Sequence, residues 1–221
     1  MAKKTFDNLK PGRQREILEV AYREFIANDY QSASLSRIIK KLNLAKGSFY
    51  RYFNSKKELY FYLIEKSTEG RFDTLEKRLQ EPDMSLQKLL YINWQDKFSF
   101  EKEHPLESAF QYRVFRERNN KEVGDLEIRF KKEIIERIKF IISNYFVDEV
   151  RTDLDVDAIA LFIVQAQLSM YDYLSIRFDE DLLRNAQEGR AIFSLHQEEL
   201  EGIVNTFIKL LMQGISNKKG T

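Results

Sequence analysis

Apolar residues recur at intervals of three and four along most of this 221-residue chain. Ile17, Ala21 and Phe25 lie on one such stripe near the start, and another runs from Leu200 to Ile215 near the end. This spacing gathers apolar side chains on one face of an α-helix, whereas a strand needs strict alternation. We find no alternating strand, no repeat and no low-complexity segment, so the pattern predicts an all-α fold.

Short polar residues and prolines indicate where the helices begin and end. Asn28 and Asp29 should end the first helix, because both residue types tolerate the left-handed conformation that closes a helix. Ser34 should cap a short second helix, and Asn43 should turn the chain into a third. We expect this third helix at about 46–53. The later helices are expected at about 55–79, 85–103, from 105 onward, around 126–141, from within 153–157 to 178, and at 200–215.

Charge is distributed unevenly along the chain. Residues 1–57 contain 13 Lys or Arg and five Asp or Glu, a net charge of +8, whereas residues 58–221 contain 23 and 30, a net charge of −7. A basic segment on an acidic body favours contact of that segment alone with a polyanion such as DNA. The alternative is a chance clustering of solvated charge.

Composition excludes several kinds of chemistry. The sequence contains no Cys, which rules out disulfides, iron–sulfur clusters and thiol nucleophiles. His104 and His196 lie far apart without metal-ligand spacing, so we expect neither a metal nor a cofactor. The N-terminal residues lack the apolar run of a signal peptide, and the most apolar stretch, 158–164, falls short of the ~20 residues of a membrane span. We expect a cytoplasmic protein with no membrane anchor.

The segment from Ser34 to Lys56 has the build of a helix-turn-helix, two helices of about two turns joined at Asn43. The side chains expected to pack this pair against the first helix are Ile38, Leu42, Leu44 and Phe49. The opposite side presents small and polar residues first and then Tyr and Arg, an order suited to base edges and flanking phosphates. These outward residues are Lys46, Gly47, Ser48, Tyr50, Arg51 and Tyr52.

The end of this motif resembles the signature of the TetR family of transcriptional regulators. Phe49-Tyr50-Arg51-Tyr52-Phe53-Asn54-Ser55-Lys56, followed by Leu59, is similar to the family pattern apolar–Tyr–x–aromatic/His–Phe–x–Ser–Lys, then Leu. The similarity covers about residues 13–65, and beyond them only the number, lengths and order of the helices agree. Asn43 stands where the family usually has Gly, and Ile39 and Leu42 stand where Ala is commoner.

The resemblance implies an N-terminal three-helix DNA-binding domain, residues 1–57, and a C-terminal helical bundle for dimerisation and ligand binding, residues 58–221. It implies a homodimeric repressor that binds a palindromic operator in double-stranded DNA and is released by a small-molecule effector. The residues expected to contact DNA are Ser34, Ser36, Lys46, Gly47, Ser48, Tyr50, Arg51, Tyr52 and Lys56.

Two further sets of residues are candidates for a dimer interface and a ligand pocket. The two long apolar stripes near the C-terminus predict interface anchors at Ile159, Phe162, Ile163, Val204, Phe207 and Leu211. A pocket would be lined by Trp94, Phe98, Phe110, Phe115, Phe140, Gln165 and Tyr171, and the many Phe residues favour a hydrophobic effector. In each case the alternative is that the residues only fill the core of their own subunit.

Other functions compete with this interpretation. A TetR-like protein without an effector would act as an architectural DNA-binding factor, and a protein-binding helical adaptor would leave the basic segment unexplained. An all-helical enzyme is the alternative from another class. The sequence, however, has no Gly-rich phosphate loop, no metal-ligand cluster and no His–carboxylate–Ser spacing. We therefore expect a regulator and not an enzyme.

Overall fold

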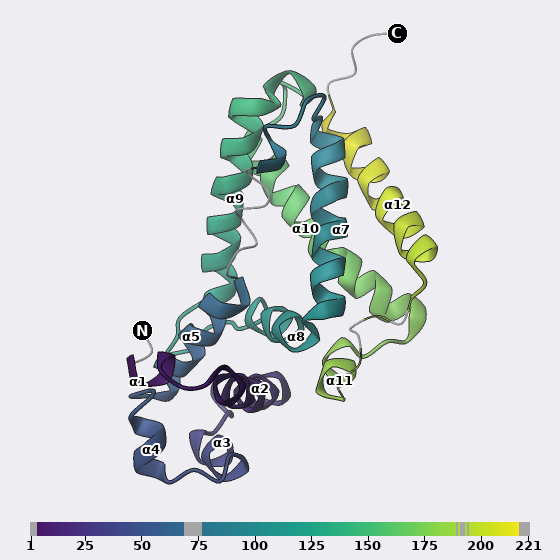
Figure 1. Cartoon of the computed structure of the whole chain (residues 1–221). Helices are drawn as coiled ribbons and strands as arrows, with labels where there is room; N and C mark the ends of the chain where they lie inside the picture. Colours follow the sequence, from purple (N-terminus) through teal and green to yellow (C-terminus); the bar gives the residue numbers. More distant parts are fainter. Residues whose placement is uncertain (1–3, 69–76, 189, 191–192, 194, 217–221) are drawn as a thin grey trace. The chain divides into compact units, whose positions relative to one another are not determined.

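The chain folds into helices joined by short connections (Figure 1). The computed structural model describes residues 4–68, 77–188, 190, 193 and 195–216. Within these residues the only β-pairings are two isolated bridges, so the predicted all-α fold is confirmed. The helices are α1 (Lys4–Asp7), α2 (Pro11–Ala27), α3 (Leu35–Lys41), α4 (Lys46–Tyr50), α5 (Lys56–Thr68), α7 (Leu86–Glu103), α8 (Pro105–Val114), α9 (Leu126–Tyr145), the short 3-10 helix η1 (Val147–Glu149), α10 (Val156–Phe178), α11 (Leu182–Gln187) and α12 (Gln197–Ile215).

The helices form two compact units, each assembled from separate stretches of sequence. The first unit takes residues 1–69, 104–127 and 182–192, and the second takes residues 70–103, 128–181 and 193–221. The first unit therefore adds α5, α8 and α11 to the helix-turn-helix segment. The functional boundary expected at residue 57 stays a prediction.

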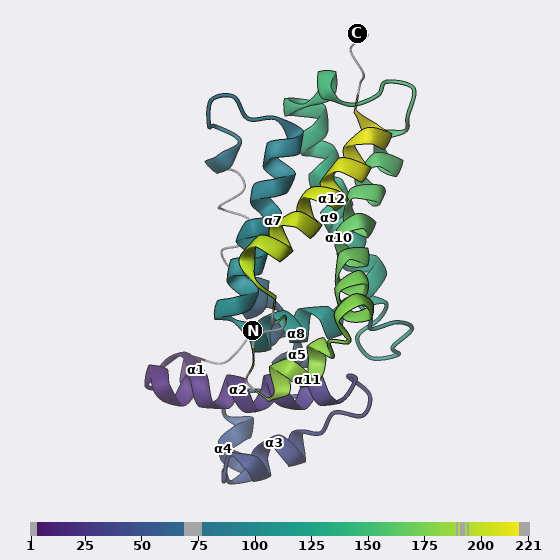
Figure 2. The same cartoon turned by 90° about the vertical axis from the view of Figure 1, so that its right-hand side faces the viewer.

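An aromatic core holds the first unit together. Pro11 occupies the first turn of α2, where its missing amide hydrogen is not needed. Helix α2 packs on α8 and α11 (Figure 2). Phe110 of α8 is fully buried, and its ring centroid lies 5.2 Å from that of Tyr22 and 5.4 Å from that of Tyr60. Rings at these distances in edge-on geometry attract one another beyond the burial of their surface.

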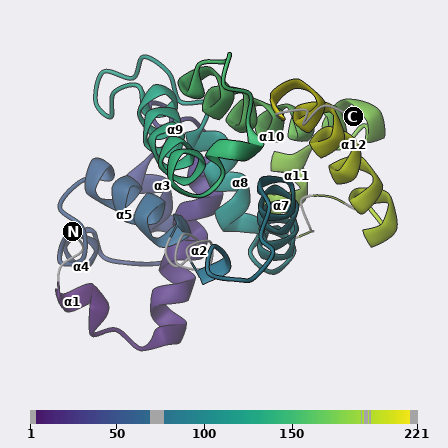
Figure 3. The same ribbon diagram turned by 90° about the horizontal axis from the view of Figure 1, so that it is seen from above.

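The second unit is built from α7, α9, α10 and α12, which Figure 3 shows from above. Its core includes Trp94 of α7, Ile142 of α9, Leu174 of α10 and Val204 of α12, each at most 1% exposed. Helix α10 begins at a cap, because the Asp155 carboxylate accepts from the backbone amide of residue 157 at 2.8 Å. The bounds of α7, α8, α9, α10 and α12 agree closely with the predicted ones, whereas part of the helix expected at 55–79 lies outside the described residues.

Helix α10 is long and apolar enough to cross a membrane, judged by length and composition alone. It is the one such helix among the described residues. Seven of its residues are buried within the chain, Ile159 and Leu174 among them. The core helix of a globular unit can have this same composition, so one such helix is weak evidence for a membrane span.

The buried indole of Trp94 and the exposed ring of Phe140 provide a test of this packing. Trp94 is 1% exposed and Phe140 is 60% exposed. We expect Trp94→Ala to lower the free energy of unfolding by about 3–5 kcal/mol, because it removes a large buried side chain and leaves a cavity. Phe140→Ala should change it by less than about 0.5 kcal/mol. Urea unfolding followed by circular dichroism measures both, and an equal decrease in the two variants would contradict the assignment of core and surface.

Candidate nucleic-acid interface

The turn between α3 and α4 is tight because Asn43 adopts a left-handed backbone. Its φ is 50°, a conformation that Asn tolerates better than most residues other than Gly. The amides of Leu42 and Leu44 donate to the carbonyls of Ile38 and Ile39 at 3.0 and 3.1 Å, which closes the end of α3. The prediction that Asn43 turns the chain between two short helices is confirmed.

Ser34 is the N-cap of α3, as predicted. Its hydroxyl accepts from the backbone amide of Arg37 at 3.4 Å, an amide that has no partner within the helix. Ser34 is half-buried, whereas Ser36 in the first turn is exposed. The start of α3 is therefore fixed in place and still offers a hydroxyl to solvent.

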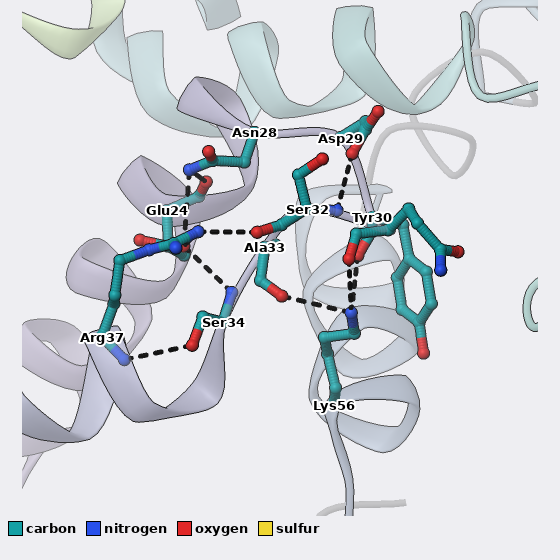
Figure 4. A network of polar contacts seen from close by, with 10 residues as sticks. Glu24, Asn28, Asp29, Tyr30, Ser32, Ala33, Ser34, Arg37 and Lys56 are labelled. Atoms are coloured by element: carbon teal, nitrogen blue, oxygen red, sulfur yellow. Dashed lines mark hydrogen bonds and ion pairs between the residues drawn. The ribbon is translucent and has the colours of Figure 1, made fainter.

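A buried carboxylate joins α2 to the start of α3 (Figure 4). Glu24 is 2% exposed, and its Oε1 accepts from Nε and Nη2 of Arg37 at 2.8 and 2.6 Å. The same oxygen accepts from the backbone amide of Ser34 at 3.0 Å and from the Asn28 side chain at 3.4 Å. These bonds fix the first turn of α3 on the end of α2. Glu24 was not among the residues singled out from the sequence. The feature that could have indicated it is a charged residue next to Phe25, on the apolar stripe of the first helix.

Lys56, at the start of α5, holds the connection between α2 and α3 from the other side. Its ammonium donates to the carbonyls of Tyr30, Gln31 and Ala33 at 2.8, 3.2 and 3.1 Å, and lies 4.5 Å from the centre of the Tyr30 ring. Lys56 was expected to contact a DNA phosphate. In the structure its three donors meet backbone carbonyls, so Lys56 braces this connection, and its contact with a phosphate stays a prediction.

Two acidic residues anchor the same connection to the loop before α9. The amide of Tyr30 donates to Glu117 at 3.1 Å, and its hydroxyl donates to Glu122 at 2.7 Å. Burial, and then the hydrogen bond to Glu122, raise the pKa of the Tyr30 hydroxyl, so it remains a donor at neutral pH. Lys57 donates to the carbonyl of Glu122 at 2.7 Å. The connection is thus held through both its backbone and its side chains.

Helix α4 has one buried and one outward side. Phe49 and, just beyond the helix, Phe53 are fully buried and pack against each other with ring centroids 5.9 Å apart. Lys46, Gly47 and Arg51 are exposed. A methyl group at Gly47 would meet no atom of the chain within 4 Å, so packing within the chain does not require glycine there.

The residues expected to contact DNA are distributed as follows. Ser36, Lys46, Gly47, Tyr50 and Arg51 are exposed, and Ser34, Ser48, Tyr52 and Lys56 are half-buried. Five of the nine are therefore exposed, and the ammonium of Lys56, one of the four half-buried residues, contacts backbone carbonyls. Whether they contact DNA stays a prediction.

The electrostatics of this segment are one-sided. Residues 30–57 carry seven Lys or Arg and no Asp or Glu. All of these cations except Lys56 are exposed, namely Arg37, Lys40, Lys41, Lys46, Arg51 and Lys57. An exposed surface with positive charge alone attracts a polyanion, and the attraction weakens as salt screens it.

A short helix that was not predicted packs against the end of this segment. Phe6 of α1 is fully buried, and its ring centroid lies 4.9 Å from that of Phe53 and 6.0 Å from that of Tyr52. The hydroxyl of Thr5 donates to the carbonyl of Arg51. The one sequence feature that could have indicated this helix is Phe6, a lone aromatic residue within a polar stretch.

The residues expected to line a ligand pocket do not all lie in one unit. Phe110 and Phe115 belong to the first unit, where Phe110 fills the aromatic core. Phe140 is 60% exposed on α9, so its expected place in a pocket is corrected to the surface. The remaining members belong to the second unit, where Trp94, Phe98 and Tyr171 are buried and Gln165 is half-buried.

The expected dimer anchors fall into a buried group and a more exposed group. Four of them are buried in the core of their own chain, namely Ile159, Ile163, Val204 and Leu211, each at most 3% exposed. They lie in the core of their own chain, because the apolar stripe marks the buried face of each helix, and their place in a dimer interface stays a prediction. Phe207 is half-buried, and Phe162 is 52% exposed.

Among the described residues, no group of three or more His, Asp or Glu side chains is placed to hold a metal ion.

Comparison with known proteins identifies a family for this segment. The family model for "Bacterial regulatory proteins, tetR family" matches residues 17–63. An HTH-type transcriptional regulator of Staphylococcus aureus (strain USA300) is 35% identical over 60 residues, which are 27% of this chain and 32% of that protein. The chain thus covers about a third of the length of the curated relatives that it matches.

Solved structures extend the likeness of fold to the rest of the chain. A TetR family transcriptional regulator from Chloroflexus aurantiacus has a TM-score of 0.72 at 23% identity, covering 99% of this chain and 100% of that one. SmeT, the repressor of the Stenotrophomonas maltophilia multidrug efflux pump SmeDEF, has a TM-score of 0.63 at 13% identity, covering 93% and 91%. Residues 17–63 thus match the family model of the TetR regulators, and the chain shares its fold with solved structures of TetR family regulators.

Proposed function

We propose that the chain is a DNA-binding transcriptional repressor of the cytoplasm that binds a palindromic operator as a homodimer and is released by a small hydrophobic effector. The observation that carries the proposal is the cation-only surface of residues 30–57 around an exposed α4. The family match over residues 17–63 supports it.

The outward side of α4 supports a role in reading the major groove. Lys46, Gly47 and Arg51 are exposed together, and the absence of a side chain at Gly47 leaves room for close approach of another molecule. Arg is suited to paired hydrogen bonds with guanine or with a phosphate, and Lys is suited to phosphate. One short helix contacts few phosphates, so specific binding needs two copies on a two-fold site.

An exposed apolar surface on α10 and α12 supports pairing of two chains. Phe162 and Ile176 of α10 are 52% and 83% exposed, and Leu210 of α12 is 64% exposed. The ring of Phe162 lies 3.9 Å from where a side chain at Gly214 of α12 would begin, so the two helices are neighbours at this point. We infer that these residues, and not the buried stripe, are the anchors of the dimer.

The effector would bind in the second unit and shift the protein between two conformers. Trp94, Phe98 and Tyr171 give that unit an aromatic core, which favours an apolar ligand. A ligand that binds one conformer better reduces affinity for DNA by its difference in affinity for the two states.

Binding to duplex DNA should depend steeply on salt and on the outward residues of α4. We expect Arg51→Ala to weaken binding and to make the slope of log K against log [salt] less negative by about 0.9 for each phosphate that the arginine neutralises. The measurement is fluorescence anisotropy on a random-sequence duplex, followed by selection of bound sequences, which should yield a palindrome. Lys88→Ala, an exposed lysine of α7, is the matched control and should leave the slope unchanged.

Gly47→Ala separates DNA binding from folding in the same assay. The added methyl meets no atom of the chain, and Ala favours a helix over Gly by roughly 1 kcal/mol, so stability should hold or rise. Affinity for the selected operator should fall by about tenfold, because the methyl would stand between α4 and the bases. Unchanged affinity, or binding that ignores salt, would contradict the proposal.

Glu24→Gln tests whether the carboxylate positions the DNA-contacting helices without touching DNA. Removal of the charge should lower the free energy of unfolding by about 1.5–3 kcal/mol, the usual worth of a hydrogen bond to a charged group. Operator affinity should fall while the salt slope stays the same, because every phosphate-binding side chain is still present. Glu19→Gln on the same helix is the control, since Glu19 forms an exposed ion pair with Arg23. A change of slope in Glu24→Gln would argue against a positioning role.

Charge placed on the exposed apolar surface should separate the dimer. We expect Ile176→Glu, and independently Phe162→Glu, to halve the particle mass in light scattering and to reduce operator affinity, because a buried unpaired carboxylate is strongly unfavourable at an interface. Ile128→Glu is the control, since Ile128 is 52% exposed on α9, outside this surface. Dimers that persist in both variants would rule out α10 and α12 as the interface.

A further inference from the structure

Glu101 is a buried carboxylate of α7 that the DNA-binding role does not explain. Glu101 is 3% exposed and belongs to the second compact unit. Ionised carboxylates are rarely buried unless their oxygens are satisfied, because removal from water is costly. The partners of its two oxygens therefore show what the residue is for.

One oxygen of Glu101 is satisfied by two donors. The ammonium of Lys97, one turn earlier on α7, lies 3.1 Å from Oε1, and the hydroxyl of Tyr171 on α10 donates to the same atom. Lys97 also lies 4.8 Å from the centre of the Tyr171 ring, a cation–π distance. The three side chains form one cluster whose charges cancel.

The other oxygen has no such partner. Oε2 of Glu101 is fully buried and accepts no hydrogen bond from the residues that the structure describes. More than nine in ten buried polar groups in proteins have a partner, and a carboxylate oxygen offers two lone pairs. An acceptor left open in this way is a ready site for a donor supplied from outside the chain.

Two further aromatic rings lie beside the Tyr171 end of this cluster. The ring centroid of Phe193 lies 5.6 Å from that of Tyr171 and 6.1 Å from that of Phe98. Phe98 is 8% exposed, whereas Phe193 is only partly buried. The surroundings of Glu101 therefore suit a flat apolar molecule that can stack on these rings.

We propose that Oε2 of Glu101 is the specificity-determining acceptor for a neutral aromatic small molecule that carries a hydroxyl or N–H donor. The proposal rests on the ligand-responsive function proposed above and names the chemical class of its effector. Because Lys97 already balances the charge of Glu101, the ligand needs a donor and not a positive charge. A ligand without a donor would leave Oε2 unpaired in an apolar site and would bind more weakly.

Glu101→Gln converts the open acceptor into a donor. Lys97 and Tyr171 both donate, so they hold the amide carbonyl where Oε1 now lies and turn the amide NH₂ toward the open position. Tyr171→Phe removes one donor from Oε1 and leaves Oε2 an acceptor. The two variants are close in shape to the native residues and make opposite predictions.

The test uses matched pairs of probes that differ by one methyl group, namely phenol and anisole, β-naphthol and its methyl ether, and indole and N-methylindole. Their binding to the full chain is measured by ligand-observed NMR, with circular dichroism to check folding. In each pair of probes that binds, we expect the member with the donor to bind the native protein at least about tenfold more tightly than its methylated partner. Glu101→Gln should reduce this preference to less than about twofold, whereas Tyr171→Phe and Glu103→Gln, an exposed neighbour on α7, should keep it.

Three outcomes would overturn the proposal. In the first, no probe with a donor binds the native protein up to the solubility limit of the probe. In the second, both members of every pair bind equally well. In the third, the preference for the donor-bearing member is unchanged in Glu101→Gln. Binding to duplex DNA is measured without any small molecule. A failure here therefore leaves the DNA-binding proposal standing, and failure of DNA binding leaves the ligand measurement interpretable.

Discussion

The bond between the buried Glu24 carboxylate and Arg37 is the interaction on which the geometry of the basic segment depends. A carboxylate in this position is tolerable only when donors surround it, and the guanidinium, the Ser34 amide and the Asn28 side chain supply them. Only one placement of the first turn of α3 brings these donors to the same oxygen. An apolar contact would have allowed α3 to slide, whereas this one specifies its position.

Lys56 and Glu117 fix the connection between α2 and α3 in the same way, by binding its backbone groups. Loops usually run over the surface because their backbone groups need water. Here an ammonium satisfies three carbonyls and a carboxylate satisfies the Tyr30 amide, so the connection is fixed without regular secondary structure. The basic segment is therefore presented by a rigid support, which suits a surface that has to match another molecule.

The local elements were predictable from sequence because their causes are local. The apolar spacing, the Ser34 cap and the left-handed Asn43 depend on neighbours a few residues away. The apolar stripe of Ile159 and Val204 was also located correctly, but periodicity reports only that a face is buried, and not whether its own chain or a second chain covers it. The sequence alone therefore could not separate a dimer interface from the core of a single chain.

Other features could not be derived because they depend on contacts distant in sequence. The roles of Glu24 and Lys56 follow from partners 13 and 26 residues away. The grouping of Phe110 with Tyr22, and of Trp94 with Phe207, requires knowledge of which helices pack together. Short helices such as α1 and α11 lack the length over which a period can be recognised.

The first compact unit draws on three stretches of chain, the last of them residues 182–192, and this has a consequence for biosynthesis. A chain is synthesised from its N-terminus, so residues 1–69 emerge from the ribosome before α8 and α11 can pack on them. Until then the aromatic faces of Tyr22 and Tyr60 lack the ring of Phe110. The aromatic core of the first unit is therefore complete only after residues 182–192 have been synthesised, so this unit folds late in the synthesis of the chain.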